Sequence, residues 1–325
     1  MSFPEILHLR KQLLSHVLLN YAPDIFLVDH MPHGAMGELL PALEAMKHSR
    51  IRTQVILGLR DILDSPDVTI QRWKVEGAYE AIERYYARIL VFGMKDVYNV
   101  VEKYQIPEGD AKKVFYCGYV TNLATANNAH TIRARYLANQ SIDTKLIVVM
   151  AGGGADAYAM MSTLIDALPK VLEHQKCVLA IVTGPFMPAE LIDDLNRRAA
   201  GLPIHMMESV HDSVSHLAAA DLVISMAGYN TSVEILRMRR PAIIIPRAGP
   251  SAEQRTRAKL FADKHWVDMI DPDELTPKKL AQRISYHFKH PMESNQNDPP
   301  NLNGAASAAA LTLSVLASKS ERIPN

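Results

Sequence analysis

The sequence lacks the features of a secreted, membrane-spanning or nucleic-acid-binding protein. Two cysteines occur, Cys117 and Cys177, each inside an apolar run, so a disulfide framework is not expected and a reducing compartment is the simpler interpretation. Lysine and arginine number 35, as do aspartate and glutamate, and this balance argues against neutralising many nucleic-acid phosphates. Residues 1–14 lack the unbroken apolar core of a signal peptide, and no apolar run reaches the roughly 18 residues that span a bilayer. We therefore expect a soluble, cytoplasmic protein that binds no nucleic acid.

The composition is that of an ordinary globular protein, with 48% hydrophobic, 22% charged and 6% aromatic residues, which excludes general disorder. A chain of 325 residues exceeds the size at which single cores stop growing, about 250–300 residues, so two domains are expected. Short β-branched runs alternate with longer stretches of helical period, which is typical of parallel α/β sheets. The expected strands are 25–28, 54–57, 88–92, 114–117, 145–150, 178–182, 204–207, 222–224, 242–245 and 267–270.

The composition turns polar between Thr121 and Ser141, and we place the boundary between the domains there. The expected division is a first domain at 1–122, a linker at 123–143, a second domain at 144–291, and a linker with a C-terminal helix at 292–325. The predicted fold class is α/β, with two doubly wound domains that face each other across a cleft. Ligands of such sheets bind outside the carboxyl ends of the strands, so the loops after the strands form the candidate site.

The first candidate loop follows the strand at 145–150 and contains three consecutive glycines, Gly152–Gly154. Glycines at such a turn let the backbone approach a phosphate, which the N–H groups of a helix N-terminus then bind. Through Ala157 the loop also fits the dinucleotide pattern G-x-G-x-x-G/A, but that pattern needs an acidic residue at the end of the next strand. Here Thr-Gly-Pro follows that strand at 183–185, so NAD is disfavoured. A tight turn without a ligand remains the alternative.

The second candidate is the stretch at 221–236, DLVISMAGYNTSVEIL. A strand ends near Ser225, Gly228 opens a loop, and Thr231 is placed to begin or cap a helix. Glu234 follows three residues later and fits a capping box with Thr231. It equally fits a carboxylate at the cleft that accepts both hydroxyls of a ribose, and the spacing does not separate the two interpretations.

The third candidate is the stretch at 243–258, IIIPRAGPSAEQRTRA. A Gly/Pro loop leads into a helix whose start presents Glu253, Gln254 and Arg257. These groups suit sugar hydroxyls and a phosphate. A solvated polar helix face is the alternative.

In this order and spacing the three stretches resemble the C-terminal donor domain of family-28 glycosyltransferases of the GT-B fold, most strongly over 145–271. The most specific part, at 220–258, is a form of the pattern A-D-x-x-I-x-x-A-G-x-x-T-x-x-E followed by a Pro-Gly loop and [DE]-Q-x-x-x-A. Two spaced motifs on consecutive strand–helix units are a far stronger signal than a lone glycine motif. The resemblance implies a transferase with Rossmann-like domains that uses a UDP-sugar, with N-acetylhexosamine as the expected sugar and neither a cofactor nor a metal.

The resemblance also implies a set of donor-site residues. These are Gly152, Gly153 and Gly154 near the phosphates, Val210 at the uracil, Gly228, Tyr229, Asn230 and Thr231 along the diphosphate, Glu234 at the ribose, and Gly249, Glu253, Gln254 and Arg257 in the third stretch, where Glu253 and Gln254 contact the donor sugar. The chain departs from the family pattern at two positions. Arg257 stands where the family often has asparagine, and Met226 stands where a basic residue often lies, so the sugar or phosphate contact is expected to be altered.

The first third fits the family less specifically. Residues 23–29 resemble a strand in the N-terminal domain of the predicted glycosyltransferase branch, and residues 118–120 occupy the place just before the linker. Such domains begin with a strand and a glycine-rich loop that carries a histidine base, whereas this chain begins on a helix at about 4–20. The first strand–helix unit is therefore expected to be missing, and the candidates for the base are His33 and Asp29, with His30 in the same loop. A solvated loop histidine is the commoner case.

The implied reaction is attack of an acceptor hydroxyl on the anomeric carbon of the donor while UDP leaves. The acceptor is unknown (a glycan, a lipid-linked molecule or a small molecule), and peripheral association with a membrane is left open. A metal would have to bind at Asp271-Pro-Asp273, which we interpret as turn chemistry. Two further classes of function remain: a nucleotide-sugar-binding regulatory protein that has lost catalysis, and a UDP-sugar hydrolase or epimerase of the same fold.

Overall fold

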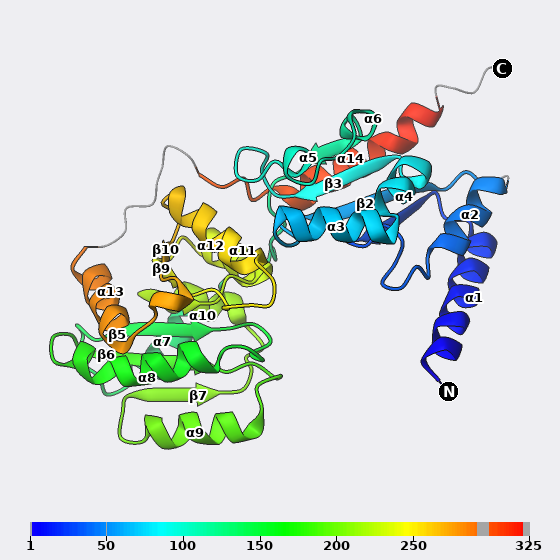
Figure 1. Ribbon diagram of the computed structural model, residues 1–325. Helices are drawn as coiled ribbons and strands as arrows, with labels where there is room; N and C mark the ends of the chain where they lie inside the picture. Colours follow the sequence, from blue (N-terminus) through cyan, green and yellow to red (C-terminus); the bar gives the residue numbers. More distant parts are fainter. Residues whose placement is uncertain (1, 50, 291–298, 321–325) are drawn as a thin grey trace. The chain divides into compact units, whose positions relative to one another are not determined.

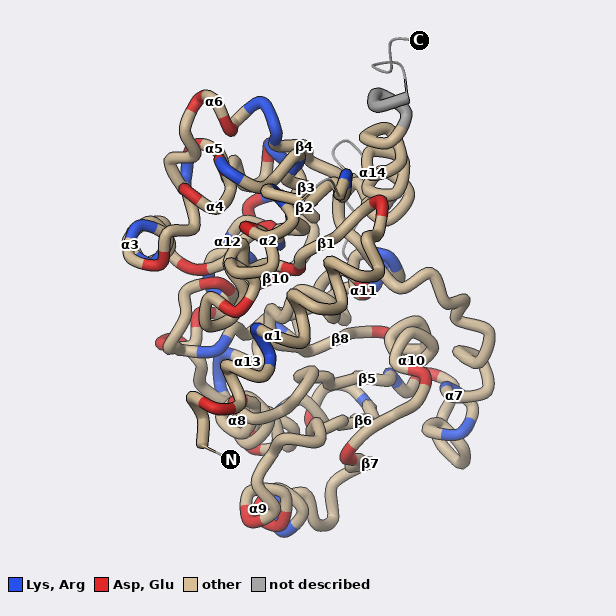
Figure 2. Tube along the Cα trace, turned by 90° about the vertical axis from the view of Figure 1, so that its right-hand side faces the viewer, with Lys and Arg blue, Asp and Glu red and all other residues tan. Residues whose placement is uncertain are grey.

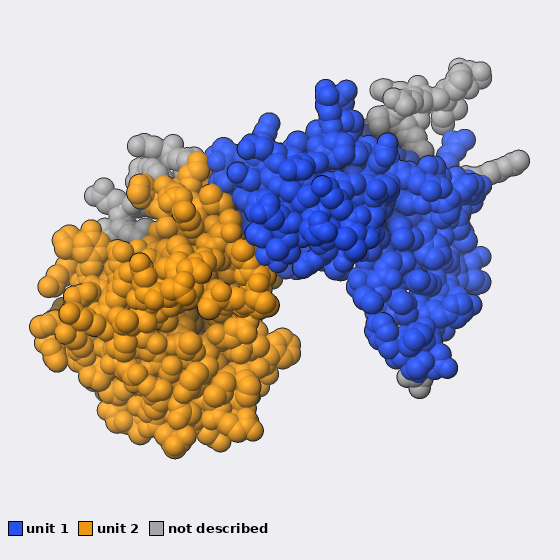
Figure 3. All heavy atoms as spheres, viewed as in Figure 1, with its two compact units in different colours: residues 1–120, 301–325 blue, residues 121–300 orange. Residues whose placement is uncertain are grey.

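The computed structural model describes residues 2–49, 51–290 and 299–320 and contains two parallel β-sheets, each with helices packed around it (Figure 1). The chain divides into two units (Figure 3): unit 1 is Met1–Val120 together with Asn301–Asn325, and unit 2 is Thr121–Pro300. No helix among the described residues is long and apolar enough to cross a membrane.

Unit 1 is built on a four-stranded parallel sheet in the order β1-β2-β3-β4. Its strands are β1 Ile25–Asp29, β2 Gln54–Arg60, β3 Arg88–Phe92 and β4 Val114–Tyr116. Its helices are α1 Phe3–Tyr21, α2 Leu40–His48, α3 Pro66–Glu76, α4 Ala78–Tyr85, α5 Val100–Lys103, α6 Glu108–Ala111 and α14 Gly304–Ser320.

Helix α14 packs on one face of this sheet, although nearly 200 residues separate it from β4 along the chain. Val315 is buried against Ile56, Leu90 and Cys117. The Arg88 guanidinium at the start of β3 donates to the carbonyl of Leu311 (2.5 Å) and to the hydroxyl of Ser314 (2.6 Å). The C-terminal helix therefore completes the core of unit 1.

Just before α14, the backbone at residues 301–304 passes in direct contact with the backbone that follows β4. The N–H of Tyr119 donates to the carbonyl of Asn301 (2.8 Å), and the N–H of Gly304 donates back to the carbonyl of Tyr119 (3.1 Å). A Cβ at Gly304 would lie 2.5 Å from the carbonyl oxygen of Gly118, and one at Gly118, where φ is +86°, would lie 2.7 Å from Asn301. Glycine is required at both positions because the two backbones touch.

Unit 2 is built on a six-stranded parallel sheet in the order β10-β9-β8-β5-β6-β7. Its strands are β5 Lys145–Met150, β6 Cys177–Val182, β7 Ile204–Met207, β8 Leu222–Ser225, β9 Ala242–Ile244 and β10 Asp268–Met269. Its helices are α7 Ala129–Tyr136, α8 Tyr158–Leu172, α9 Ala189–Ala199, α10 Ser213–Ala219, α11 Tyr229–Met238, α12 Glu253–Asp263 and α13 Pro277–Lys289, with a 3₁₀-helix at Pro272–Glu274. The strand order reverses between β5 and β8, and ligands bind at such a reversal point in doubly wound sheets.

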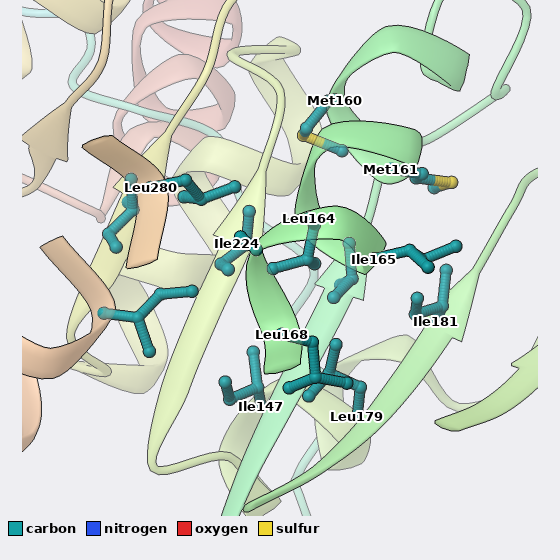
Figure 4. Close-up of a cluster of buried hydrophobic side chains, with 14 of the residues drawn as sticks. Ile147, Met160, Met161, Leu164, Ile165, Leu168, Leu179, Ile181, Ile224 and Leu280 are labelled. Carbon is teal, nitrogen blue, oxygen red and sulfur yellow. The ribbon is translucent and has the colours of Figure 1, made fainter. Parts of the chain in front are cut away.

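The core of unit 2 lies between its sheet and helices α8, α9 and α13. Leu168 of α8 lies beside Ile147 of β5 and Leu179 of β6, and Leu164, one turn earlier, lies beside Ile224 of β8 (Figure 4). Leu280 of α13 joins the same cluster. The central strands are buried on both faces, which explains why their sequences are continuous apolar runs without alternation.

The structure confirms all ten expected strands within three residues at each end. It differs from the expected domain division in two places. Helix α7 lies inside the expected linker at 123–143, where buried Ile132 and Tyr136 hold it against α10. The C-terminal helix, expected to lie apart in the tail at 292–325, belongs to unit 1. Residues 291–298, at the start of that expected tail, lie outside the described part of the chain.

Candidate functional site

Three loops begin side by side at the carboxyl edge of the second sheet. Met150 at the end of β5 is in register with Ser225 at the end of β8, and Ser225 is in register with Ile244 at the end of β9. The Ser225 hydroxyl donates to the carbonyl of Met150. The loops that follow, at 151–157, 226–228 and 245–252, contain parts of all three motifs that the sequence singles out.

Packing explains two of the three glycines in the loop after β5. A Cβ at Gly154 would lie 2.0 Å from the carbonyl oxygen of Thr183, and one at Gly153 would lie 2.8 Å from the ring of Phe186. The N–H of Phe186 donates to the carbonyl of Gly153 (2.8 Å). Gly152 is exposed, with φ at +63°. The tight-turn interpretation thus accounts for Gly153 and Gly154, and their contact with phosphate stays a prediction.

Packing does not explain the glycines in the other two loops. A Cβ at Gly228 or at Gly249 would meet no described heavy atom within 4 Å, and neither residue has a positive φ. Gly228 is the N-cap of α11, and it is followed by buried Tyr229 and exposed Asn230. Gly228 has no side chain, and open space lies beside it at the N-terminus of α11. A ligand can therefore reach the backbone N–H groups there.

The structure excludes the capping box that the sequence offered for Glu234. Helix α11 begins at Tyr229, so Thr231 is already the third helical residue and makes no capping hydrogen bond. The Glu234 carboxylate instead faces α10, where the hydroxyl of Ser213 donates to it at 3.4 Å. Burial raises the pKa of Glu234, against the opposing effects of Ser213 and Arg237. A half-buried carboxylate with a single long hydrogen bond of this kind retains capacity to accept further hydroxyls.

The expected uracil contact, Val210, lies half-buried in the loop between β7 and α10. Two residues further on, Asp212 caps α10 by accepting from the N–H of Ser215 (2.9 Å), and Asn128 also donates to it (2.9 Å). Because Ser213 begins α10 and reaches Glu234, the Val210 loop ends next to the carboxylate expected at the ribose. Sequence reasoning missed Ser213, which belongs to no motif.

Helix α12 presents the third motif. Arg257 is fully buried; its Nη1 donates to the carbonyl of Ala227 (2.9 Å) and to Oε1 of Glu253 (2.9 Å). Its guanidinium also lies over the ring of Tyr229, 5.5 Å from the centroid. The Gln254 side chain accepts from the N–H of Arg247 (3.2 Å). Arg257 therefore ties the loop after β8 to the start of α12 and sets the position of Glu253, whereas the sequence suggested an exposed cation.

Asp221, which opens the second motif, serves the fold. It lies directly before β8, at the opposite edge of the sheet from the three loops. Its carboxylate accepts from the N–H of Leu146 (2.7 Å) and pairs with Arg133 of α7 (2.9 Å). This pairing joins α7 to the sheet.

The candidate bases lie in unit 1, in and after β1. Asp29 is exposed at the end of the strand, whereas His33 is buried, with Nε2 3.4 Å from the carboxylate of Glu76. Among the described residues, Nδ1 of His33 has no hydrogen-bond partner. It lines a cavity of about 20 Å³ together with Thr69 and Trp73, which has room for one water molecule and none for a sugar. The loop histidine is thus held by a carboxylate, and its role as a base stays a prediction.

The Asp-x-Asp sequence has the expected turn role. Asp271 caps the 3₁₀-helix by accepting from the N–H of Asp273 (3.0 Å), and both carboxylates pair with Arg255. No group of three or more histidine, cysteine, aspartate or glutamate side chains among the described residues is arranged to hold a metal ion.

Comparison with known proteins identifies relatives for the second half of the chain. The model of the glycosyltransferase family 28 C-terminal domain matches residues 147–312. An enzyme of Citrifermentans bemidjiense named UDP-N-acetylglucosamine--N-acetylmuramyl-(pentapeptide) pyrophosphoryl-undecaprenol N-acetylglucosamine transferase is 31% identical over 157 residues, 47% of this chain and 43% of that protein. The enzyme of the same name from an Anaeromyxobacter species is 26% identical over 162 residues, 50% of this chain and 42% of that protein. The chain thus aligns with less than half the length of these relatives.

Solved structures share the fold of the whole chain. A putative UDP-N-acetylglucosamine 2-epimerase from Listeria monocytogenes is 15% identical with a TM-score of 0.67, covering 100% of this chain and 82% of that one. MurG from Acinetobacter baumannii is 15% identical with a TM-score of 0.58, covering 95% and 80%. At these identities the likeness shows the fold alone. The family model matches half of the chain, in the part that contains all three motifs, and the chain therefore belongs to glycosyltransferase family 28.

Proposed function

We propose that the chain transfers a hexosyl group, with N-acetylhexosamine as the expected sugar, from a UDP-sugar to an acceptor hydroxyl. The observation that supports this most directly is Glu234, a half-buried carboxylate beside the reversal point of the sheet that no capping role explains. Membership of family 28 and the two curated relatives, both named as N-acetylglucosamine transferases, support the choice of donor.

The proposed chemistry follows from the elements at the carboxyl edge. Glu234 accepts the ribose hydroxyls, and the backbone at Gly228 and Gly249 approaches the diphosphate and the sugar. The N-termini of α11 and α12 direct N–H groups and a positive dipole end toward the same edge, which stabilises the leaving diphosphate. Glu253, held by Arg257, accepts a sugar hydroxyl with its second oxygen.

Three parts of the proposal concern the reaction itself. A base, with His33 as first candidate and Asp29 as second, removes the proton of the acceptor hydroxyl. Neither a metal nor a cofactor is required, so activity is expected to be unchanged by EDTA. The acceptor, whether glycan, lipid-linked or small, and peripheral association with a membrane stay predictions.

The donor site is tested by the affinity for UDP, measured by calorimetry. Glu234→Ala is expected to weaken UDP binding about tenfold or more, because charge-assisted hydrogen bonds each contribute about 1.5–3 kcal/mol. The same variant should no longer distinguish UDP from 2′-deoxy-UDP. The matched control is Glu173→Ala, which removes an exposed carboxylate at the end of α8 and should leave the affinity unchanged. Unaltered UDP binding by Glu234→Ala would show that the donor site has been misplaced.

Turnover decides between the proposed function and its alternatives. Release of UDP from UDP-N-acetylglucosamine only when an acceptor is present supports the transferase. Release without an acceptor indicates a hydrolase, and exchange at the sugar carbon with UDP retained indicates an epimerase, a reaction named for solved proteins of this fold. Saturable binding with no turnover under any condition indicates a binding or regulatory protein.

A further inference from the structure

Basic and acidic residues are interspersed over both units (Figure 2). Any charged side chain that assists the helix N-termini in binding an anion at the carboxyl edge of the second sheet must therefore be an individual cation. Arg247 is the only lysine or arginine in the loops that follow β5 to β9, all of which the structure describes. The nearby arginines of α12 form ion pairs with carboxylates: Arg255 pairs with Asp271, and Arg257 pairs with Glu253.

The surroundings of Arg247 leave its guanidinium with spare hydrogen-bonding capacity. The backbone is fixed, since its N–H donates to Gln254 (3.2 Å). Its Nε is buried and has no hydrogen-bond partner among the described residues. Its Nη1 lies 3.5 Å from a carboxylate oxygen of Asp156, whose side chain is 52% exposed. A buried N–H without a partner is costly, and a bond of 3.5 Å to an exposed carboxylate contributes little.

The position of this pair links two of the three loops of the site. Asp156 lies in the glycine-rich loop after β5, and Arg247 lies in the loop after β9. Between β5 and β9 lies β8, whose loop carries Gly228, where a Cβ would meet no described atom within 4 Å. The pair thus spans the place where the proposed function puts the diphosphate.

We propose that Arg247 is the cation of the diphosphate subsite and that Asp156 competes with the diphosphate for it. The proposal rests on the proposed function, because it assigns one charge contact within that same site. A guanidinium presents a planar set of donors that matches phosphate oxygens in pairs. A diphosphate carries more negative charge than one carboxylate, so it displaces Asp156 and supplies the acceptor that Nε lacks.

If Asp156 competes with the diphosphate for Arg247, removing the negative charge of Asp156 should increase the affinity for UDP. Asp156→Asn keeps the shape of the side chain and is expected to tighten UDP binding about two- to fivefold, the range of an exposed ion pair. Arg247→Gln is expected to weaken UDP binding about 10- to 100-fold. The affinity for uridine, which has no phosphate, should be the same in both variants and in the unsubstituted protein.

The double variant separates competition from simple repulsion. If Asp156 acts by occupying Arg247, the gain from Asp156→Asn disappears in the Arg247→Gln background. A gain that persists there would show that Asp156 only repels the anion, and the competition would be refuted. Asp193→Asn on α9, also an exposed residue, makes the same change in net charge and should leave UDP affinity unchanged.

The remaining outcomes are also decisive. If the unsubstituted protein binds UDP and Asp156→Asn does not improve the affinity, this inference is wrong and the proposed function is untouched. If the unsubstituted protein binds neither UDP nor UDP-N-acetylglucosamine, the proposed function itself is wrong. Because Asp156 is exposed, its substitution tests the proposal even if Arg247→Gln fails to fold. Arg247→Lys then serves as the second variant and should bind UDP more weakly than the unsubstituted protein, because an ammonium group cannot pair with two phosphate oxygens as a guanidinium does.

Discussion

The glycines at the carboxyl edge of the second sheet have different reasons to be glycine. Gly153 and Gly154 allow the loops after β5 and β6 to touch, and Gly152 adopts a positive φ. Gly228 and Gly249 are required by neither packing nor conformation. A motif search treats all five alike, whereas the structure separates the glycines that packing or conformation explains from the two that neither explains.

At Glu234 the proposed role in binding opposes the stability of the folded protein. Burial raises its pKa above the ordinary value of 4.5, so the folded state disfavours the ionised form. Below the ordinary pKa the carboxyl is protonated in both states and the penalty is absent. As the pH rises through the folded pKa, ionisation destabilises the folded protein by an amount that then stays constant.

Glu234→Gln is therefore expected to raise the thermal unfolding midpoint at pH 7–8 and to leave it unchanged at pH 4. The reason is that glutamine keeps the shape of the side chain and removes the buried charge. The same variant should bind UDP about tenfold more weakly, because a neutral amide accepts hydroxyls less strongly than a carboxylate. Scanning calorimetry at the two pH values tests the first expectation. A lower midpoint at pH 7–8 would contradict it.

At the scale of elements, the strands were predictable and two helix assignments were not. Continuous apolar runs such as Cys177–Val182 have no other stable place than a sheet buried on both faces. Helix α7 was hidden in a polar stretch, where only Ile132 and Tyr136, four residues apart, indicate a packed face. The start of α11 was misplaced by three residues, since Thr231 resembles an N-cap more than Gly228 does. The N-cap preference is a local propensity, and the tertiary structure outweighs it here.

The packing of α14 on the first sheet is tested by two substitutions on that helix. Val315→Ala removes two methyl groups from a buried contact with Ile56 and Leu90 and is expected to destabilise the protein by about 2 kcal/mol. Leu313→Ala changes a side chain that is 63% exposed and should have an effect below about 0.5 kcal/mol. Urea unfolding measures both. Equal effects of the two substitutions would show that α14 does not pack as described.

At the scale of the whole molecule, sequence reasoning found two domains and misassigned the C-terminal helix. No local signal tells an apolar helix which of two sheets it covers, because both present apolar faces. The family could be named from the sequence because two spaced motifs lie on consecutive strand–helix units, β8–α11 and β9–α12, and together match one family pattern. Arg247 was missed because a single cation in a loop forms no pattern, and only its buried Nε and its neighbour Asp156 single it out.

Each unit contains one of the two tryptophans, and this allows ligand binding to be assigned to a unit. Trp73 is buried in unit 1 and Trp266 in unit 2. With UDP at 100 times its dissociation constant, the binding unit gains about 2.7 kcal/mol, or about 5–10 °C in its unfolding midpoint. Fluorescence of the Trp73→Phe variant, which reports on Trp266, should show this shift. The Trp266→Phe variant, which reports on Trp73, should show a smaller shift of the unfolding midpoint. A larger shift at Trp73 than at Trp266 would show that UDP binds to unit 1 and that the proposed donor site is wrong.

The return of the chain to unit 1 at Asn301 has a consequence for the order of events during synthesis. Strands β1 to β4 leave the ribosome before the helix that covers Ile56, Leu90 and Cys117, which follows after roughly 180 further residues. At about 5–20 residues per second, this interval lasts roughly 10–35 s. During that time unit 2, whose residues are contiguous, can fold completely, whereas the first sheet keeps an apolar face uncovered. The nascent chain is thus most exposed to aggregation, and most in need of a chaperone, in the unit whose strands are made before unit 2 and whose covering helix is made after it.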